Sequence, residues 1–113
     1  MIARVWHGVV RLENADGYGK YLADSDLGVR DYRRVPGHRG VFLLRRAEGA
    51  HVHFLLISLW ESRKAIEGYA GPDLEHARYF PYDLQCLVEP EPNVVHYEVV
   101  VAHEAAHLSN FQR

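Results

Sequence analysis

Histidine is the side chain in this sequence best suited to move protons at neutral pH, and 8 of the 113 residues are histidine. Imidazole changes its charge at about pH 6.5, so it can act as an acid or a base under physiological conditions. His7 lies within an apolar, β-branched segment next to Trp6. An unprotonated imidazole there could take a proton from a phenol or an activated carbon acid. A buried histidine bonded to a backbone carbonyl is the alternative interpretation.

A second histidine pattern, His-Glu-Ala-Ala-His at residues 103–107, matches the H-E-x-x-H motif of zinc proteases. In that motif two histidines on one helix face bind zinc and the glutamate acts as the base. The residues after this motif include no His, Asp, Glu or Cys that could be a third ligand. We therefore expect no metal site, and we expect His51 and His53 to be solvated. No other cofactor is predicted, because the sequence has no phosphate-binding loop and no dinucleotide motif.

Charge and composition narrow the classes of partner. The chain carries 13 Lys and Arg against 15 Asp and Glu, so neither nucleic acid nor an anionic membrane is an expected partner. No apolar run approaches the roughly 18 residues of a membrane-spanning helix. The single cysteine, Cys86, cannot form an internal disulfide, which is typical of a reducing compartment, so we expect a cytoplasmic protein.

Four segments rich in β-branched and aromatic residues have the composition of β-strands. The middle two are separated by a short turn at Gly49, so they are predicted to form a hairpin. The predicted strands cover residues 2–10, 39–47, 51–60 and 93–102.

Helices are predicted between these strands from capping residues and from apolar side chains spaced three and four apart. The first helix begins after Asn14 and is broken near Gly28. The second begins after Ser62, and Asp73 is the predicted cap of a third, short helix that runs to about residue 80. Residues 81–92, which contain three prolines, are expected to be irregular.

The resulting order, β-α-β-β-α-β, is that of the ferredoxin-like α+β fold, a four-stranded antiparallel sheet with helices on one face. Residues 51–60 are almost wholly apolar, so both faces of this strand need to be covered. Helices cover one face, and a second copy of the sheet is the expected cover for the other. We therefore predict one domain over residues 1–102, a polar tail over 103–113 and a homodimer that pairs through the sheet face.

Three sequence elements carry a resemblance to a known family. They are Ile-Ala-Arg-Val-Trp-His-Gly at residues 2–8, Pro-Gly-His-Arg-Gly at 36–40, and Leu-Trp-Glu-Ser-Arg-Lys-Ala-Ile-Glu-Gly-Tyr at 59–69. Over about residues 1–101 the chain resembles the antibiotic-biosynthesis-monooxygenase-like family of the dimeric α/β-barrel superfamily. The resemblance implies a dimeric α/β barrel with a small-molecule ligand. That family contains cofactor-independent oxygenases of polyketide-like aromatics, haem-degrading enzymes and members without assigned chemistry.

The active members of the family allow a comparison position by position. Haem-degrading members use an Asn, a Trp and a His, where this chain has His7, Tyr69 and Tyr79. A shift of a few residues would place His76 as the axial haem ligand. Polyketide-oxidising members have an Asn and a Tyr flanking the Trp that corresponds to Trp60, and this chain retains only the Trp.

The residue types and the resemblance together define the candidate site. His7, expected to face the pocket between sheet and helices, is the predicted base. Trp60 is the second predicted catalytic residue or, alternatively, a core aromatic. Tyr69, His76 and Tyr79 are predicted to line the substrate pocket, or else to pack as ordinary helix residues. The arginines that could hold a carboxylate or an enolate are Arg4, Arg45 and Arg46.

The main functional hypothesis is a cofactor-independent monooxygenase acting on a small aromatic or polyketide-like molecule. In such a reaction the substrate carbanion or phenolate itself reduces oxygen, so the protein supplies a base, an apolar pocket and positioning. Proton-transfer chemistry, such as isomerisation or cyclisation, would use the same base and pocket. Two further alternatives are a non-catalytic binding or stress-response module, whose pocket is filled by its own side chains, and a haem-binding or haem-degrading protein.

Overall fold

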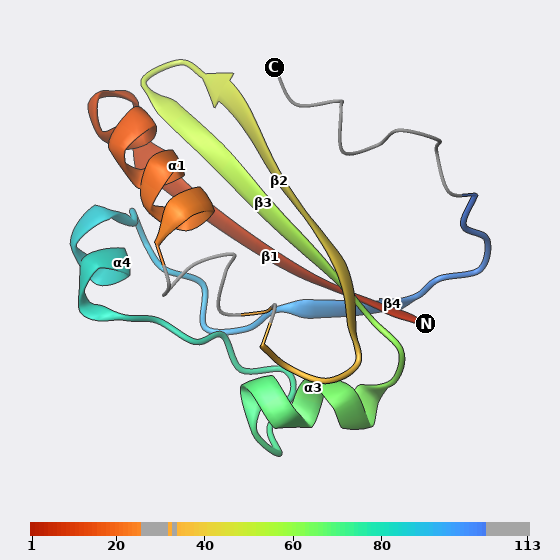
Figure 1. Ribbon diagram of the computed structural model, residues 1–113. Helices are drawn as coiled ribbons and strands as arrows, with labels where there is room; N and C mark the ends of the chain where they lie inside the picture. The colour runs from red at the N-terminus through yellow and green to blue at the C-terminus, as the bar shows by residue number, and fades with distance from the viewer. Residues whose placement is uncertain (26–31, 33, 104–113) are drawn as a thin grey trace.

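A computed structural model describes residues 1–25, 32 and 34–103 of the chain. Its four strands form one antiparallel sheet in the order β2-β3-β1-β4, which confirms the predicted ferredoxin-like α+β fold (Figure 1). No helix in the described part of the chain is long and apolar enough to cross a membrane. The elements are β1 (Ile2–Arg11), a 3-10 turn (Leu12–Asn14), α1 (Ala15–Asp24), β2 (His38–Glu48), β3 (His51–Trp60), α3 (Arg63–Ala70), α4 (Pro81–Cys86) and β4 (Val95–Glu98).

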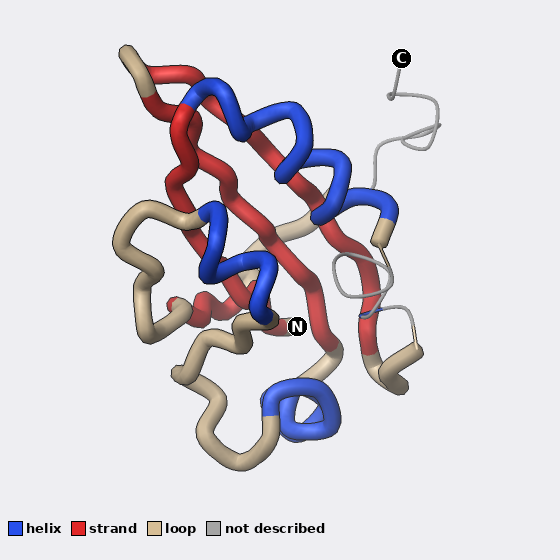
Figure 2. Tube along the Cα trace, turned by 90° about the vertical axis from the view of Figure 1, so that its left-hand side faces the viewer, coloured by secondary structure: helices blue, strands red, loops and turns tan. Residues whose placement is uncertain are grey.

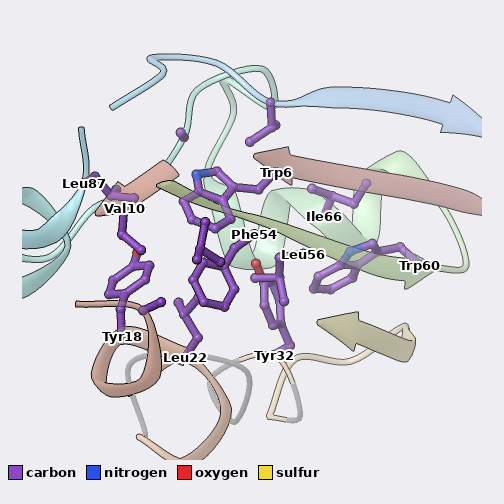
Figure 3. Close-up of a cluster of buried hydrophobic side chains, with 14 of the residues drawn as sticks. Trp6, Val10, Tyr18, Leu22, Tyr32, Phe54, Leu56, Trp60, Ile66 and Leu87 are labelled. Carbon is purple, nitrogen blue, oxygen red and sulfur yellow. The ribbon is translucent and has the colours of Figure 1, made fainter. Parts of the chain in front are cut away.

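The helices lie on one face of the sheet, and the core lies between the two layers (Figure 2). Strands β1 and β3 pair along their whole length, from Ile2 opposite Trp60 to Arg11 opposite His51. Successive strand residues point to opposite faces, and the even-numbered residues of both strands are buried beneath the helices. Figure 3 shows the resulting cluster of aromatic and aliphatic side chains between sheet and helices.

The large indole of Trp6 fits into this layer because the next residue on the same face is a glycine. A Cβ atom built at Gly8 would lie 2.4 Å from the Trp6 ring, a distance that real side chains do not tolerate. The ring therefore lies back along β1, where only a glycine leaves space for it.

Of the three predicted helix caps, Asn14, Ser62 and Asp73, only Ser62 caps a helix with its side chain. Ser62 caps α3 as predicted, and its hydroxyl accepts a hydrogen bond from the backbone N–H of Ala65 at 3.1 Å. Asn14 does not cap α1 with its side chain, because it already belongs to the 3-10 turn that precedes this helix. The predicted break near Gly28 lies outside the described residues.

The prediction of a helix over 73–80 and an irregular segment over 81–92 is wrong at both points. Residues 73–80 form a turn and extended backbone, while residues 81–86 form α4. The backbone of the first segment bonds to the chain near residue 93 instead of to itself, since Ala77 donates to Pro92 and Val94 donates to Glu75. Pro81 is well placed at the start of α4, where its missing N–H costs no helical bond.

Strand β4 spans four residues, Val95–Glu98, rather than the predicted ten. It pairs only with Ile2–Val5, the beginning of β1, in the register Glu98 opposite Ile2. The pairing ends there because Ile2 is the first residue of β1; Val99 makes one further backbone hydrogen bond, to the carbonyl of Met1, and residues 100–103 form no strand. The predicted tail lies outside the described residues from position 104 onward, and with it most of the H-E-x-x-H motif.

The face of the sheet opposite the helices, here called the open face, carries the odd-numbered residues of β1 and β3. It is rich in apolar side chains, as the sequence predicted. Leu55, Ile57 and Leu59 are only partly buried there. The neighbouring strands add exposed large apolar residues, namely Phe42, Leu44, Val95 and Tyr97.

Candidate functional site

A small cavity of about 40 Å³, open to solvent, lies between the sheet and the helices. Its lining is mostly aromatic, with two arginines and one carboxylate. Such a lining suits a planar apolar ligand with a few polar groups. The lining residues are Arg4, Trp6, Tyr18, Leu22, Tyr32, Leu56, Tyr69, Arg78, Tyr79, Phe80, Asp83 and Val94.

Arg4 is a charged residue in the buried face of β1, with an exposed fraction of 3%. Its guanidinium donates to the carbonyl oxygen of Leu74 at 2.6 Å and to that of His76 at 3.1 Å. Within the described part of the chain no Asp or Glu forms an ion pair with it. Burial lowers the pKa of Arg4, although an arginine stays charged in proteins. The cavity therefore contains a fixed positive charge whose direct hydrogen-bond partners are neutral, and the nearby Glu75 carboxylate offsets it only in part.

His96 is the third partner of Arg4, with its Nε2 atom 3.1 Å from the guanidinium. Arginine cannot accept a hydrogen bond, so Nε2 must be the acceptor and the imidazole must be unprotonated there. Burial, followed by the nearby Arg4 charge, lowers the pKa of His96. This neutral imidazole orients Arg4 without neutralising it.

Tyr69 forms the aromatic wall next to these charges. The Arg4 guanidinium carbon lies 5.8 Å from the centre of the Tyr69 ring, and that of Arg78 lies 4.8 Å from it. Arg78 also lies 5.3 Å from the ring of Phe80. Cations over aromatic faces are held in place by the electron density of the ring. The two arginines and Tyr69 thus form one positively charged wall.

Two further polar side chains of the cavity lining, those of Trp6 and Tyr79, are hydrogen-bonded to each other. The Trp6 indole N–H donates to the Tyr79 hydroxyl at 3.1 Å, and this hydroxyl donates to the backbone carbonyl of Glu91. Burial is the main cause that raises the pKa of Tyr79, so its phenol stays protonated at neutral pH. The Tyr79 oxygen is therefore a fixed polar group in the cavity wall.

Tyr18 and Asp83 make a second buried polar pair at the edge of the cavity. The Tyr18 hydroxyl donates to Asp83 at 2.7 Å, and the other carboxylate oxygen accepts from the backbone N–H of Phe80 at 2.8 Å. Burial and the hydrogen bond to Asp83 raise the pKa of Tyr18. Because both Asp83 oxygens are engaged, this carboxylate holds the start of α4 rather than acting as a free base.

Of the predicted site residues, Tyr69 and Tyr79 line the cavity, and their contact with a ligand stays a prediction. Trp60 is fully buried behind the cavity, and its indole N–H donates to Ser58 at 2.9 Å. The side chain of His76 is exposed and does not belong to the cavity lining. Only the backbone carbonyl of His76 serves the site, through Arg4.

The predicted orientation of His7 is wrong. His7 and Trp6 do face opposite sides of β1, as expected, but Trp6 faces the cavity and His7 faces the open face. The reason is the register of the strand, because the buried face carries Ile2, Trp6 and Val10. His7 therefore cannot be a base for a ligand in this cavity.

Sequence reasoning did not anticipate the charged wall. Arg4 was one of three candidate arginines without a preferred place, and Arg78 was not a candidate. A partial signal was present in β1, where Arg4 lies on the same side of the strand as Trp6 and Val10, but the sequence alone does not show that this side is the buried one. A charged residue within a buried stripe is a stronger functional signal than one on a solvated face. The structure places Arg45 instead beside the exposed Asp16 carboxylate, at 3.0 Å.

Comparison with solved structures identifies the class of fold. The haem degrader MhuD from Mycobacterium tuberculosis, solved with two haems in its active site, aligns with a TM-score of 0.62 and 21% identity, over 92% of this chain and 100% of that one. An antibiotic biosynthesis monooxygenase aligns with a TM-score of 0.58 and 18% identity, over 89% and 100%. A putative member from Bacillus cereus aligns with a TM-score of 0.56 and 15% identity, over 95% and 97%.

The protein thus has the fold of the antibiotic-biosynthesis-monooxygenase-like proteins, and the predicted resemblance is confirmed at the level of the fold. No protein-family model and no curated protein sequence matches the chain. Identities of this size establish a shared fold and leave the chemistry to be argued from the site.

Proposed function

We propose that the protein binds a small aromatic molecule with an acidic group in the cavity between sheet and helices, and that it oxygenates this molecule without a bound cofactor. The observation that carries the proposal is the buried Arg4 charge, which has no direct hydrogen bond or ion pair to a carboxylate among the described residues and lies beside the aromatic wall of Tyr69. A buried charge is costly unless it is paired. An anionic ligand would supply a direct partner, and its ring would pack against the aromatic lining once the side chains of the cavity wall move apart to admit it.

The charged wall also supplies a chemical function that His7 cannot supply from the other face. Positive charge favours the ionised form of a phenol or an enol, so Arg4 and Arg78 would lower the pKa of such a substrate. The ionised ring is electron-rich enough to reduce oxygen directly, which makes a protein base unnecessary. In the balanced reaction a ring CH₂ group and O₂ give a carbonyl group and water. The protein would bind the anion, orient it and exclude water.

Binding is tested with a matched pair of ligands, 2-naphthoate and its neutral amide, by calorimetry. We expect the carboxylate to bind roughly tenfold more tightly, as a charge-assisted hydrogen bond to a buried arginine predicts. Arg4→Met removes this preference, Arg4→Lys retains part of it, and Arg45→Met on the protein surface leaves it unchanged. Equal affinity of the two ligands for the wild-type protein would overturn the proposal.

Oxygenation is tested with an oxygen electrode and a panel of naphthols and hydroxylated anthrones. We expect one O₂ consumed per product, and a product that has gained one oxygen and lost two hydrogens by mass spectrometry. Ligand binding without oxygen uptake by any substrate would refute the oxygenase part and support the alternative of a non-catalytic binding module.

Haem binding is tested separately, by titration of the protein with haem. The exposed His76 does not line the cavity, so we expect no axial ligation by this residue. A Soret shift on haem titration that is lost in His76→Ala would contradict the proposed function and favour haem as the ligand.

The open face supports a further part of the proposal, a homodimer. Phe42 is 40% exposed, Leu44 46%, Val95 51% and Tyr97 58%, and all four lie on this one face. A contiguous apolar sheet face is typical of an interface, and a second copy presents an equally apolar surface of the same shape. We expect a solution mass of twice the 13.0 kDa chain mass, and a return to the chain mass in Val95→Asp. A monomeric wild-type protein would refute this part.

A further inference from the structure

Two histidines that sequence analysis assigned to different roles meet on the open face. His7 Nε2 lies 2.9 Å from His53 Nδ1. The far nitrogen of each ring contacts a carboxylate, since His7 Nδ1 lies 2.6 Å from Glu91 and His53 Nε2 lies 2.9 Å from Glu48. The four side chains form an unbroken series in the order Glu91, His7, His53, Glu48, and we call the two imidazoles the histidine pair.

The three contacts fix the number of protons on the pair. Carboxylates only accept, so His7 Nδ1 and His53 Nε2 must each carry a proton. If both rings were neutral, His7 Nε2 and His53 Nδ1 would then face each other with two lone pairs at 2.9 Å. One further proton between them turns this repulsion into a hydrogen bond. The arrangement therefore needs three protons on two imidazoles, which is one positive charge shared by the pair.

The ring geometry fits a proton between the two nitrogens. The ring centres are 5.2 Å apart and the ring planes differ by 23°. The contacting nitrogens are closer than the ring centres, so the rings lie nearly coplanar and end to end. Hydrogen bonds prefer this in-line arrangement. In the described part of the chain no group of three His, Cys, Asp or Glu side chains could hold a metal ion.

The shared charge also balances the charges around it. Arg46, which faces His53 across the strand pair, lies 3.4 Å from Glu48. The hydrogen bond from His53 and the charge of Arg46 lower the pKa of Glu48, which keeps it ionised. One charge on the pair and one on Arg46 then offset the carboxylates of Glu48 and Glu91. The cluster is neutral with three imidazole protons, negative with two and positive with four.

The location of this cluster links its charge to the interface. His7 and His53 line a hollow on the open face together with Leu44 and Leu55, which belong to the apolar surface of the proposed dimer. Covering the hollow with a second copy removes water from the cluster. That step costs least when the cluster is neutral and its hydrogen bonds are complete.

We propose that the histidine pair holds one shared proton and thereby sets the pH range in which two copies of the chain associate through the open face. The inference rests on the proposed dimer. Above this range the pair loses its shared hydrogen bond and the cluster becomes negative. Below it, a second added proton places two N–H groups against each other and the cluster becomes positive. Dimer affinity is therefore highest between these limits.

Other titratable and charged groups also lie near the pair and are part of the test. Arg46 and Glu48 face it from β2, and Glu91 faces it from the segment that follows α4. Arg11 and His51, opposite each other at the end of the β1–β3 pair, lie one step beyond on the same face. His51 is exposed and shares the strand and parity of His53, so it is the matched control.

The proton count is tested by NMR on protein labelled with ¹⁵N in histidine. We expect His7 and His53 to show bound protons on three of their four ring nitrogens at the pH of highest dimer affinity, with coupling across the Nε2–Nδ1 contact. His51 serves as the internal reference. Two neutral rings without that coupling would overturn the shared proton whatever the oligomeric state.

The consequence for association is tested by sedimentation between about pH 5 and about pH 9, where imidazoles change charge. We expect the dimer dissociation constant to rise on the order of tenfold on each side of its minimum, as an uncompensated charge at an interface predicts. The double variant with His7→Gln and His53→Gln keeps side chains that can hydrogen-bond but cannot titrate, so its dissociation constant stays flat, while that of His51→Gln follows the wild type. A wild-type dimer with a flat profile overturns the inference alone, and a monomer at every pH overturns the proposed dimer with it.

Discussion

The two faces of the sheet are the open face and the helix face, which is the face covered by the helices. They carry the same kinds of side chain but bury them to different extents. On the helix face a charged residue, Arg4, is buried and held by backbone carbonyls, and a tyrosine, Tyr18, is buried against a carboxylate. On the open face Arg46 and Tyr97 are exposed, and the polar groups gather around one histidine pair. Helices of the same chain cover the helix face, whereas no element of the described residues covers the apolar part of the open face. We infer that the first face provides stability and a ligand site and that the second provides association.

The largest expected effect comes from a matched pair of phenylalanines, one on each face. Phe54 is 1% exposed and packs edge to face on Tyr18, whereas Phe42 is 40% exposed on the open face. We expect Phe54→Ala to lower the free energy of unfolding by about 3–5 kcal/mol, because it leaves a cavity in the core. Phe42→Ala is expected to cost less than about 1 kcal/mol in dilute solution, as is usual for surface substitutions.

Urea denaturation at several protein concentrations provides the measurement. If a second copy covers the open face, the cost of Phe42→Ala grows with protein concentration, while that of Phe54→Ala does not. A loss as large for Phe42→Ala as for Phe54→Ala in a monomeric sample would contradict the distinction between the two faces.

A pair of tyrosines sharpens the comparison with a smaller effect. Tyr18→Phe removes the hydrogen bond to Asp83 and is expected to cost about 1.5–3 kcal/mol, the range for a bond to a charged group. Tyr97→Phe, 58% exposed on the open face, is the control and should be neutral.

The Tyr18 pair also predicts a dependence on alkaline pH. The pKa of Tyr18 is raised in the folded protein, so the folded state keeps a proton that the unfolded state releases at about pH 10. Stability is therefore fully present below about pH 10 and is lost as the pH rises beyond it. Tyr18→Phe should reduce this alkaline loss, and an unchanged alkaline slope in urea titrations would show that the phenol is not protected.

The sequence predicted the order of strands and helices along the chain, the ferredoxin-like fold, the hairpin at Gly49 and the opposite orientation of Trp6 and His7. It could not predict whether Trp6 or His7 points toward the helices, because both sides of β1 are apolar. Val5 and Val9 lie on one side of the strand, and Trp6 and Val10 lie on the other. Periodicity identifies a strand but does not select its buried face when both are apolar.

The interchange of helix and loop after α3 has a similar physical cause. Asp73 has the local signal of a helix cap, but the backbone there pairs with residues 92–94, which are distant in sequence. The site depends on this pairing, because Arg4 bonds to two carbonyls of the same segment. Neither the segment nor the role of Arg4 could therefore be derived from local propensity.

The smallest effect expected concerns the histidines of the two faces. His96, on the helix face, has a lowered pKa because of burial and the Arg4 charge, so the folded state stays neutral where the unfolded state takes up a proton. Its contribution to stability is present above about pH 6.5 and is lost as the pH falls below that value. His96→Gln should flatten this acidic loss in urea titrations, and His51→Gln on the open face should not. If both variants lost stability at acidic pH as the wild type does, the loss would come from other groups. The interpretation that a neutral His96 orients Arg4 would then be wrong.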